Sequence, residues 1–321
     1  MTYLVTGATG FIGSNLVELL CGRGEKVVGL DPGTLPKHQR RVFGALPGEF
    51  VHVQGDVRDL PLLRTTIAAH GVSRVIHAAA ITSGPERETA DGPTVIDVNL
   101  VGTANVAQAA GEVGVERFVL AGSLGVYFVP GYPDGTVVDE SYPHRPGSLY
   151  TISKSVAEAV ARRICALHGQ SFVIGRIGTA YGPWERQTGF RDTMSPVFEA
   201  TEMALRGRPA VFKFDRPSNW HYGRDAAEAL ATLADAPAPR HEDYNLGPDE
   251  VWAMTDWCAR LAEQFPGFRY EVGTPTTVEV YDEREGGRIS GARFAAEFGP
   301  TARFGIDAAF EDYMRWVGGR G

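Results

Sequence analysis

A tyrosine, a lysine and a serine have the types and the spacing that acid–base chemistry requires. Tyr150 and Lys154 lie four residues apart at the start of a long helical pattern, so they share one face of a helix. A free tyrosine has a pKa near ~10, and one nearby cation lowers that pKa by ~1–3. Ser123 closes a β-rich run and can hydrogen-bond the oxygen of a reacting group. The three residues predict proton transfer between Tyr150 and a substrate hydroxyl.

The elements that position these residues follow a regular alternation. Short apolar, β-rich runs alternate with amphipathic helical stretches to about residue 176, which is typical of a parallel sheet with crossover helices. We expect strands at Tyr3–Thr6, Lys26–Leu30, Phe50–Gln54, Arg74–His77, Arg117–Ala121 and Ser171–Arg176. We expect helices at Phe11–Cys21, Leu60–His70, Val95–Val113, Tyr150–His168, Asp192–Arg206, Arg224–Ala234 and Met254–Phe265. Ser123 then closes the fifth strand, and Tyr150 opens the helix before the sixth.

A glycine-rich turn follows the first strand, in Thr6-Gly7-Ala8-Thr9-Gly10-Phe11-Ile12-Gly13. Glycines between a strand and a helix let the backbone turn tightly and approach a pyrophosphate, whose charge the helix N-terminus meets. Asp31 ends the second strand, where its carboxylate accepts hydrogen bonds from ribose hydroxyls and repels a 2′-phosphate. NAD is therefore the predicted cofactor, and Lys37, Arg40 and Arg41 keep NADP open as an alternative.

Several landmarks occur in the order found in extended short-chain dehydrogenases: Gly-x-x-Gly-x-x-Gly, Gly55-Asp56-Val57, His77-Ala78-Ala79-Ala80, Asn99, and Ser123 with Tyr150-x-x-x-Lys154. The chain resembles that group and, within it, the NAD-dependent epimerase/dehydratase family, over nearly its whole length. The resemblance implies catalytic roles for Ser123, Tyr150, Lys154 and Asn99. It implies cofactor contacts at Gly7, Thr9, Gly10, Phe11, Ile12, Gly13, Asp31, Asp56, Val57, Ala78, Ala79, Ala80, Asn99, Tyr150, Lys154, Ile177 and Thr179.

The alternation and the resemblance together predict an α/β fold. We expect a Rossmann-type doubly wound parallel sheet with a smaller mixed α/β substrate lobe. Residues 1–178 form the predicted dinucleotide-binding domain, which also receives about 212–247. Residues 179–211 and 248–321 form the predicted substrate lobe, because the alternation gives way there to segments punctuated by proline and glycine.

The predicted substrate site departs from the family's sugar-nucleotide enzymes at two positions. Thr179 stands where those enzymes place an asparagine, and Ser218 where they place an arginine for the diphosphate. These departures favour NAD-dependent oxidation of a secondary hydroxyl on a sugar, a sugar acid or a hydroxy amino acid. Arg216 keeps a phosphate contact open, so a sugar-nucleotide epimerase like UDP-glucose 4-epimerase is the alternative, and a non-catalytic NAD(H) sensor is an alternative of another class. The candidate substrate contacts are Thr82, Ser83, Ser123, Tyr150, Thr179, Arg186, Trp220 and His221.

Charge and composition exclude several classes of partner. The net charge of -8 argues against nucleic-acid binding, and the basic run at residues 37–41 is interpreted as a solvated loop. No apolar run approaches the ~20 residues that span a bilayer, and the first strand leaves no room for a signal peptide. Three distant cysteines favour a reducing, cytoplasmic setting, and no metal-ligand spacing occurs. Besides a small-molecule substrate, the resemblance implies a homodimer through the helix of Tyr150 and Lys154 and the long helix before it. The apolar helix face fits either that interface or packing on the sheet, and it consists of Ile152, Val156, Ala157, Val160, Ala161 and Ile164.

Overall fold

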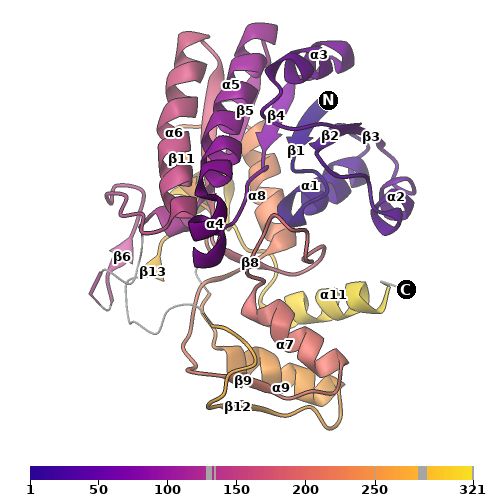
Figure 1. The fold of residues 1–321 in the computed structure, drawn as a ribbon, viewed down its shortest axis with the longest axis vertical. Coiled ribbons are helices and arrows are strands. Elements are labelled where there is room, and N and C mark those ends of the chain that lie inside the picture. Colours follow the sequence, from indigo (N-terminus) through magenta and orange to yellow (C-terminus); the bar gives the residue numbers. More distant parts are fainter. Residues whose placement is uncertain (128–131, 134, 249, 281–287, 320–321) are drawn as a thin grey trace.

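A seven-stranded sheet forms the centre of the computed structural model, which describes residues 1–127, 132–133, 135–248, 250–280 and 288–319 (Figure 1). The strand order is β11-β7-β5-β4-β1-β2-β3, and every neighbouring pair is parallel. The direction of winding reverses between β1 and β4, where α/β folds bind ligands at the carboxyl ends of the strands. The strands are β1 (Thr2–Thr6), β2 (Lys26–Asp31), β3 (Glu49–Gln54), β4 (Arg74–His77), β5 (Arg117–Ser123), β7 (Ser171–Ile177) and β11 (Asp243–Asn245).

Helices cover both faces of the sheet (Figure 1). On one face α1 (Phe11–Gly22) packs against α8 (Gly223–Asp235). On the other face α5 (Gly102–Val113) packs between α3 (Leu60–His70) and α6 (Leu149–Leu167). Each layer closes over its own buried apolar core, because each helix turns an apolar stripe toward the sheet. The prediction of a doubly wound parallel α/β sheet is confirmed.

A smaller group of elements lies below the sheet in Figure 1. Its core is aromatic: Trp257 is fully buried and stacks on Trp252, with 5.8 Å between the ring centroids. The elements around this core are α7 (Pro196–Leu205), α9 (Met254–Gln264), α11 (Ile306–Gly318), β9 (Ala210–Phe212) and β12 (Tyr270–Val272). The remaining elements are α2 (Lys37–Phe43), α4 (Pro85–Ile96), the π turn η1 (Asp97–Val101), the 3-10 turn η2 (Leu124–Tyr127), β6 (Val137–Val138), β8 (Thr179–Tyr181), β10 (Trp220–Tyr222), β13 (Arg288–Ile289) and α10 (Ala292–Phe298).

All six predicted strands are present, and so are the predicted helices that follow β1, β3 and β5. The prediction of one helix over Val95–Val113 is wrong, because the segment divides into the end of α4, the π turn and α5. The basic run predicted to be a solvated loop is helix α2, in which Gln39 is 1% exposed. Sequence patterns did not predict β11, α10 or α11.

Candidate active site

One cavity of about 1580 Å³ runs along the carboxyl edge of the sheet. Its wall combines strand ends and turns of the sheet with residues 186–193 and 214–219 from farther along the chain. The predicted site residues that line it are Gly7, Thr9, Gly10, Phe11, Ile12, Gly13, Asp31, Asp56, Val57, Ala78, Ala79, Ala80, Thr82, Ser123, Tyr150, Lys154, Ile177, Thr179 and Arg186. Asn99, Ser83, Trp220 and His221 are not among the lining residues.

The glycine-rich turn connects β1 to α1 and needs its glycines for space. Gly7 has a φ of +68°, which glycine adopts freely. A Cβ on Gly7 would lie 2.9 Å from the Cα of Ala79, and a Cβ on Gly13 would lie 2.0 Å from the carbonyl oxygen of Gly7. The first turn of α1 lines the cavity, and its N–H groups lack acceptors within the helix. An anion is therefore stabilised at this turn.

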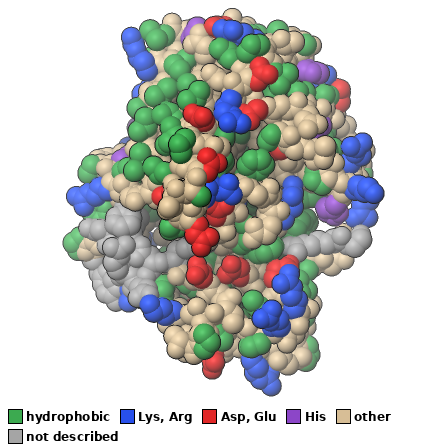
Figure 2. Space-filling model, in the orientation of Figure 1, with side chains coloured by type: hydrophobic (Ala, Val, Ile, Leu, Met, Phe, Trp, Pro, Cys, Tyr) green, Lys and Arg blue, Asp and Glu red, His purple; other side chains and the backbone are tan. Residues whose placement is uncertain are grey.

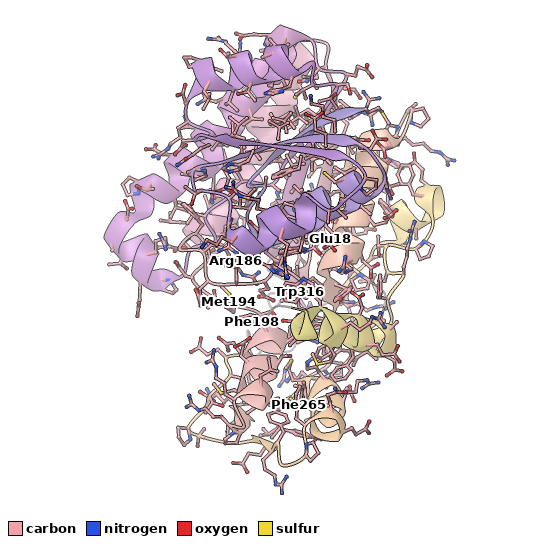
Figure 3. All side chains as sticks on the ribbon, turned by 90° about the vertical axis from the view of Figure 1, so that its right-hand side faces the viewer. Glu18, Arg186, Met194, Phe198, Phe265 and Trp316 are labelled. Carbon is pink, nitrogen blue, oxygen red and sulfur yellow. The ribbon has the colours of Figure 1, made fainter. Side chains whose placement is uncertain are left out.

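Three side chains hold the backbone of Thr9 in this turn by hydrogen bonds. Its N–H donates to Oδ2 of Asp31 at 3.2 Å. Its carbonyl accepts from Nε2 of Gln39 at 3.0 Å and from Nη2 of Arg186 at 2.9 Å. Gln39 comes from α2, whereas Arg186 comes from the segment after β8. Figure 3 shows Arg186 between the sheet and the smaller group of elements. Arg186, which we predicted to contact substrate, therefore lies beside the dinucleotide turn.

Asp56 and Val57 continue the wall beyond the end of β3. The Asp56 carboxylate accepts from Nη2 of Arg58 at 2.7 Å, and this hydrogen bond holds the pKa of Asp56 below its ordinary value. Val57 is 5% exposed and packs closely on Gly102, where a Cβ would lie 2.5 Å from its Cγ2. The wall is thus tied to α5 at a position where only glycine fits.

Helix α6 carries the predicted acid–base pair. Ser148 caps this helix, because its hydroxyl accepts a backbone N–H of the first turn at 3.2 Å. Tyr150 lies in that first turn, and its phenol hydrogen-bonds with the side chains of Ser123 and Thr82. Burial raises the pKa of Tyr150, while the two hydrogen bonds and the charge of Arg191 lower it. The structure therefore brings Tyr150 and Ser123 together inside the cavity.

Lys154 lies one helical turn after Tyr150 and is 6% exposed. Its Nζ donates to the carbonyl of Ala121 at 2.6 Å, in the strand that ends at Ser123. Burial lowers the pKa of Lys154 to about 8, and the negative charge of Glu158 acts in the opposite direction. A cation that titrates close to neutral pH thus lines the same cavity as the phenol.

Asn99 lies in the π turn between α4 and α5 and is 1% exposed. Its Oδ1 accepts from the N–H of Ile81 at 2.7 Å, and its Nδ2 donates to the Ile81 carbonyl at 2.9 Å and to Oγ of Ser153 at 3.0 Å. The Ser153 hydroxyl donates to the carbonyl of Tyr150 at 2.7 Å. Asn99 therefore joins the cavity wall at Ile81 to the helix of Tyr150 without lining the cavity itself. Single π turns frequently mark functional sites.

His77 ends β4 and is fully buried behind the site. Its Nδ1 lies 2.6 Å from Oγ1 of Thr6, and its Nε2 lies 2.9 Å from Oγ1 of Thr103. Burial, with the charge of Lys154, lowers the pKa of His77 to about 3. The neutral ring links β1, β4 and α5 by hydrogen bonds.

Arg191 is a lining residue that the sequence analysis missed. Its guanidinium carbon lies 5.4 Å from the centroid of the Phe11 ring, and its Nη2 lies 3.2 Å from Oε1 of the buried Glu185. A parallel β-bridge pairs Arg191 with Thr82. The cation that lowers the pKa of Tyr150 is thus positioned by a segment distant in sequence, which no local pattern marks.

Three predicted substrate contacts lie elsewhere. Trp220 packs on Trp252 with 5.3 Å between ring centroids, and its Nε1 donates to the Trp252 carbonyl at 2.8 Å. His221 is fully buried in β10, and neither of its ring nitrogens has a hydrogen-bond partner among the described residues. Ser83 donates to Oε1 of Glu88 at 3.1 Å. We therefore leave Ser83, Trp220 and His221 out of the proposed substrate site.

The residues that the structure describes hold neither a cluster of metal-ligating side chains nor a helix that could cross a bilayer. No group of three or more His, Cys, Asp and Glu side chains there is placed to hold a metal ion. None of the helices formed by those residues has the length and apolar character to cross a bilayer. All three cysteines are buried as free thiols.

The model of the NAD dependent epimerase/dehydratase family matches residues 3–247. The chain belongs to this family. A putative UDP-glucose 4-epimerase from Methanocaldococcus jannaschii is 33% identical over 290 residues, which cover 89% of this chain and 87% of that protein. UDP-glucuronate 4-epimerase 5 from Arabidopsis thaliana is 30% identical over 231 residues, 70% of this chain; the chain spans only 50% of that protein's length. The solved structure of Thermus thermophilus UDP-glucose 4-epimerase in complex with NAD has a TM-score of 0.78 at 27% identity, over 98% of this chain and 99% of its own.

This member of the NAD-dependent epimerase/dehydratase family is an enzyme, and its cofactor is NAD. The residues present fit that dinucleotide. The glycine-rich turn leaves the first turn of α1 open to a pyrophosphate, and the Asp31 carboxylate at the end of β2 suits a ribose that carries two hydroxyls. Lys37, Arg40 and Arg41, which had kept NADP open, are not lining residues of the cavity. The predicted family and the predicted cofactor are both confirmed.

Proposed function

We propose that the chain oxidises a secondary hydroxyl of a nucleotide sugar and then reduces the same carbon, so that the net reaction is epimerisation. The size of the cavity carries this proposal. At about 1580 Å³ it exceeds the roughly 300–1,000 Å³ of a site for one small molecule, so it has room for a dinucleotide and for a second ligand of similar size. The UDP-sugar epimerases among the relatives support a ligand of that kind.

The lining of the cavity includes side chains of the kinds that a nucleotide diphosphate requires. Arg216 and Arg288 line it, and guanidinium groups suit phosphate oxygens. Phe214, Val251 and Ile289 add apolar wall beside them. This proposal differs from the preference for a small polar substrate that the sequence alone favoured, because the cavity is larger than such a substrate needs.

The chain's own residues would act on the proton of the substrate hydroxyl. Tyr150 Oη accepts that proton while Ser123, within hydrogen-bond reach of the phenol, orients the substrate oxygen. Lys154, one turn away, stabilises the phenolate that proton acceptance requires. When bound, the nicotinamide of NAD supplies the hydride chemistry. In the return half of the reaction Tyr150 donates the proton back.

Tyr150→Phe tests this assignment, because it removes the hydroxyl and keeps the ring. With UDP-glucose as probe, we expect the parent enzyme to form the C4 epimer, which proton NMR detects. We expect no net gain of absorbance at the reduced nicotinamide band, because an epimerase returns the hydride. Tyr150→Phe should bind NAD normally and turn over about 10²–10⁴-fold more slowly. Turnover that survives in Tyr150→Phe contradicts the mechanism.

A dehydrogenase for a small polar substrate is the second candidate, and Ser218 favours it. Ser218 carries a short hydroxyl where sugar-nucleotide enzymes of the family place an arginine. Its backbone pairs with that of Trp252, with N···O distances of 3.1 and 3.3 Å, which fixes this position. A dehydrogenase accumulates NADH with sugars, sugar acids or hydroxy amino acids, whereas an epimerase does not. A non-catalytic sensor would bind NAD and turn over none of these probes.

We also propose that the enzyme works as a homodimer in the cytoplasm. Val101, Val113, Ile152 and Val156 on η1, α5 and α6 are each 39–44% exposed. Figure 2 shows hydrophobic side chains gathered at the upper left of this face, over the helices that Figure 1 places there. A second copy packed on α5 and α6 would cover this apolar surface. The buried free thiols are in keeping with a reducing compartment.

A further inference from the structure

A buried carboxylate lies next to Lys154 and outside the cavity. Glu158 follows Lys154 by one turn of α6 and is 2% exposed. Its carboxylate occupies the space beside Gly122, where a Cβ would lie 3.0 Å from Oε1. Gly122 lies between Ala121 and Ser123 in β5. The carbonyl of Ala121 accepts the hydrogen bond from the Lys154 ammonium. Because Gly122 has no side chain, β5 leaves space at this position for the carboxylate of Glu158.

Arg176 holds this carboxylate in place. Its Nε donates to Oε1 and Oε2 of Glu158 at 3.0 and 3.2 Å, and its Nη2 donates to Oε2 at 2.8 Å. Arg176 pairs directly with Gly122 across β7 and β5, so the ion pair lies against the strand itself. Nη1 donates to the hydroxyl of Tyr127 at 2.6 Å, and Nη2 lies 3.0 Å from Oδ2 of Asp243. These contacts leave the carboxylate little freedom to move.

The ion pair belongs to a cluster with an excess of negative charge. Three carboxylates, of Glu140, Glu158 and Asp243, meet two guanidiniums, of Arg176 and Arg293. With all five ionised, the cluster holds one more negative charge than positive, and Glu158 is the member whose charge raises the pKa of Lys154. Among the described residues, the charged and titratable groups next to Lys154 or Glu158 are His77 from β4, Arg176 from β7 and His144 from the loop before α6, while Tyr150 on α6 lines the same cavity as Lys154.

We propose that Glu158, held by Arg176 in the space that Gly122 leaves, is a positioning residue that keeps Lys154 charged and aligned toward Tyr150. A buried ammonium with one hydrogen bond, to the Ala121 carbonyl, is costly to keep charged unless a negative charge lies near it. His77 is held neutral by its burial and supplies no such charge. The importance of Lys154 rests on the proposed function, but its charge can be measured without any substrate.

The titration of Lys154 tests this inference directly. The chain contains four lysines, Lys26, Lys37, Lys154 and Lys213, so a protein labelled with ¹³C at the lysine ε-carbons gives few signals. The signal absent from Lys154→Arg identifies Lys154, whose midpoint we expect near pH 8 in the parent. In Glu158→Gln the midpoint should fall by about 1 pH unit, because an opposite charge nearby has been removed.

Glu140→Gln is the matched control, since it removes another carboxylate of the same cluster, whose side chain is 2% exposed and accepts from the N–H of Asn245 rather than acting on Lys154. A fall in Glu158→Gln with the parental midpoint in Glu140→Gln supports the inference. An unchanged midpoint in Glu158→Gln, or an equal fall in both variants, overturns it. If Glu158→Gln does not fold, Glu158→Asp replaces it: its retracted carboxylate should still lower the midpoint, and a parental midpoint there overturns the inference. Because no turnover is measured, failure of the proposed function leaves this result intact.

Discussion

Replacing His221 by leucine should make the protein less sensitive to mild acid. The ring is fully buried in β10, and neither nitrogen has a hydrogen-bond partner among the described residues, so the replacement removes no described hydrogen bond. Burial lowers the pKa of His221 to about 3 in the folded protein. An unfolded histidine has a pKa near ~6.5. Below that pH the unfolded state binds a proton that the folded state does not, so stability falls as the pH falls from about 6.5 toward 3.

The size of this loss follows from the two pKa values. A pH of 5 is about 1.5 units below the pKa of histidine in the unfolded chain, and each unit is worth about 1.4 kcal/mol. His221 therefore lowers the free energy of unfolding by about 2 kcal/mol between pH 7 and pH 5. His77, also fully buried with a pKa of about 3, adds a similar loss. Asp225 opposes them, because burial raises its pKa to about 6 and the folded state then gains a proton over the same range. A difference between variants therefore isolates His221.

Urea unfolding at pH 7 and pH 5 measures this difference. We expect the free energy of unfolding of His221→Leu to lose about 2 kcal/mol less than that of the parent between the two pH values. His241→Leu is the control, because it makes the same replacement at an exposed histidine instead of a buried one. A parental loss of stability in His221→Leu would show that the buried ring does not resist protonation, and the reasoning from its burial would fail.

Three further predictions concern the turn, the π turn and the helix surface. Gly13→Ala should raise the dissociation constant for NAD by at least about 10-fold, measured by calorimetry, because its Cβ would lie 2.0 Å from the Gly7 carbonyl; parental affinity contradicts this. Asn99→Ala should lower the free energy of unfolding by about 2–4 kcal/mol in urea, since it strands buried partners at Ile81; a loss under ~1 kcal/mol would mean that water replaces them. Ile152→Glu should turn a dimer into a monomer by light scattering, and a parent that is already monomeric refutes the proposed interface.

Local patterns were sufficient for six of the seven strands of the sheet and for most of the predicted residues at its carboxyl edge. The strands from β1 to β7 are short apolar runs, and a buried parallel sheet requires that composition. Tyr150 and Lys154 were found because a helix places residues four apart on one face, and the glycine-rich turn because its spacing follows a strand. The family resemblance added Asn99, whose function depends on a π turn that no periodicity predicts.

Contacts between distant segments were not predictable in the same way. Arg191 reaches the cavity through a bridge to Thr82, and neither segment has a pattern that announces the other. Gln39 sits in a basic stretch that suggested solvent, yet its amide turns inward to Thr9. His221 was predicted to contact substrate together with its neighbour Trp220, yet it is buried in β10. A three-residue strand such as β10 carries too little alternation to show which side faces the cavity.

The two donors on the Thr9 carbonyl come from segments that are distant in sequence but pack on one core, because Phe43 of α2 and Trp184 beside Arg186 lie 5.3 Å apart between ring centroids. Gln39 follows the turn closely in sequence, whereas Arg186 comes only after six of the seven strands of the sheet and after β8. Cofactor affinity and the docking of that later segment are consequently linked equilibria. We therefore expect a change that loosens the Arg186 segment to weaken NAD binding, and bound NAD to favour the docking of that segment.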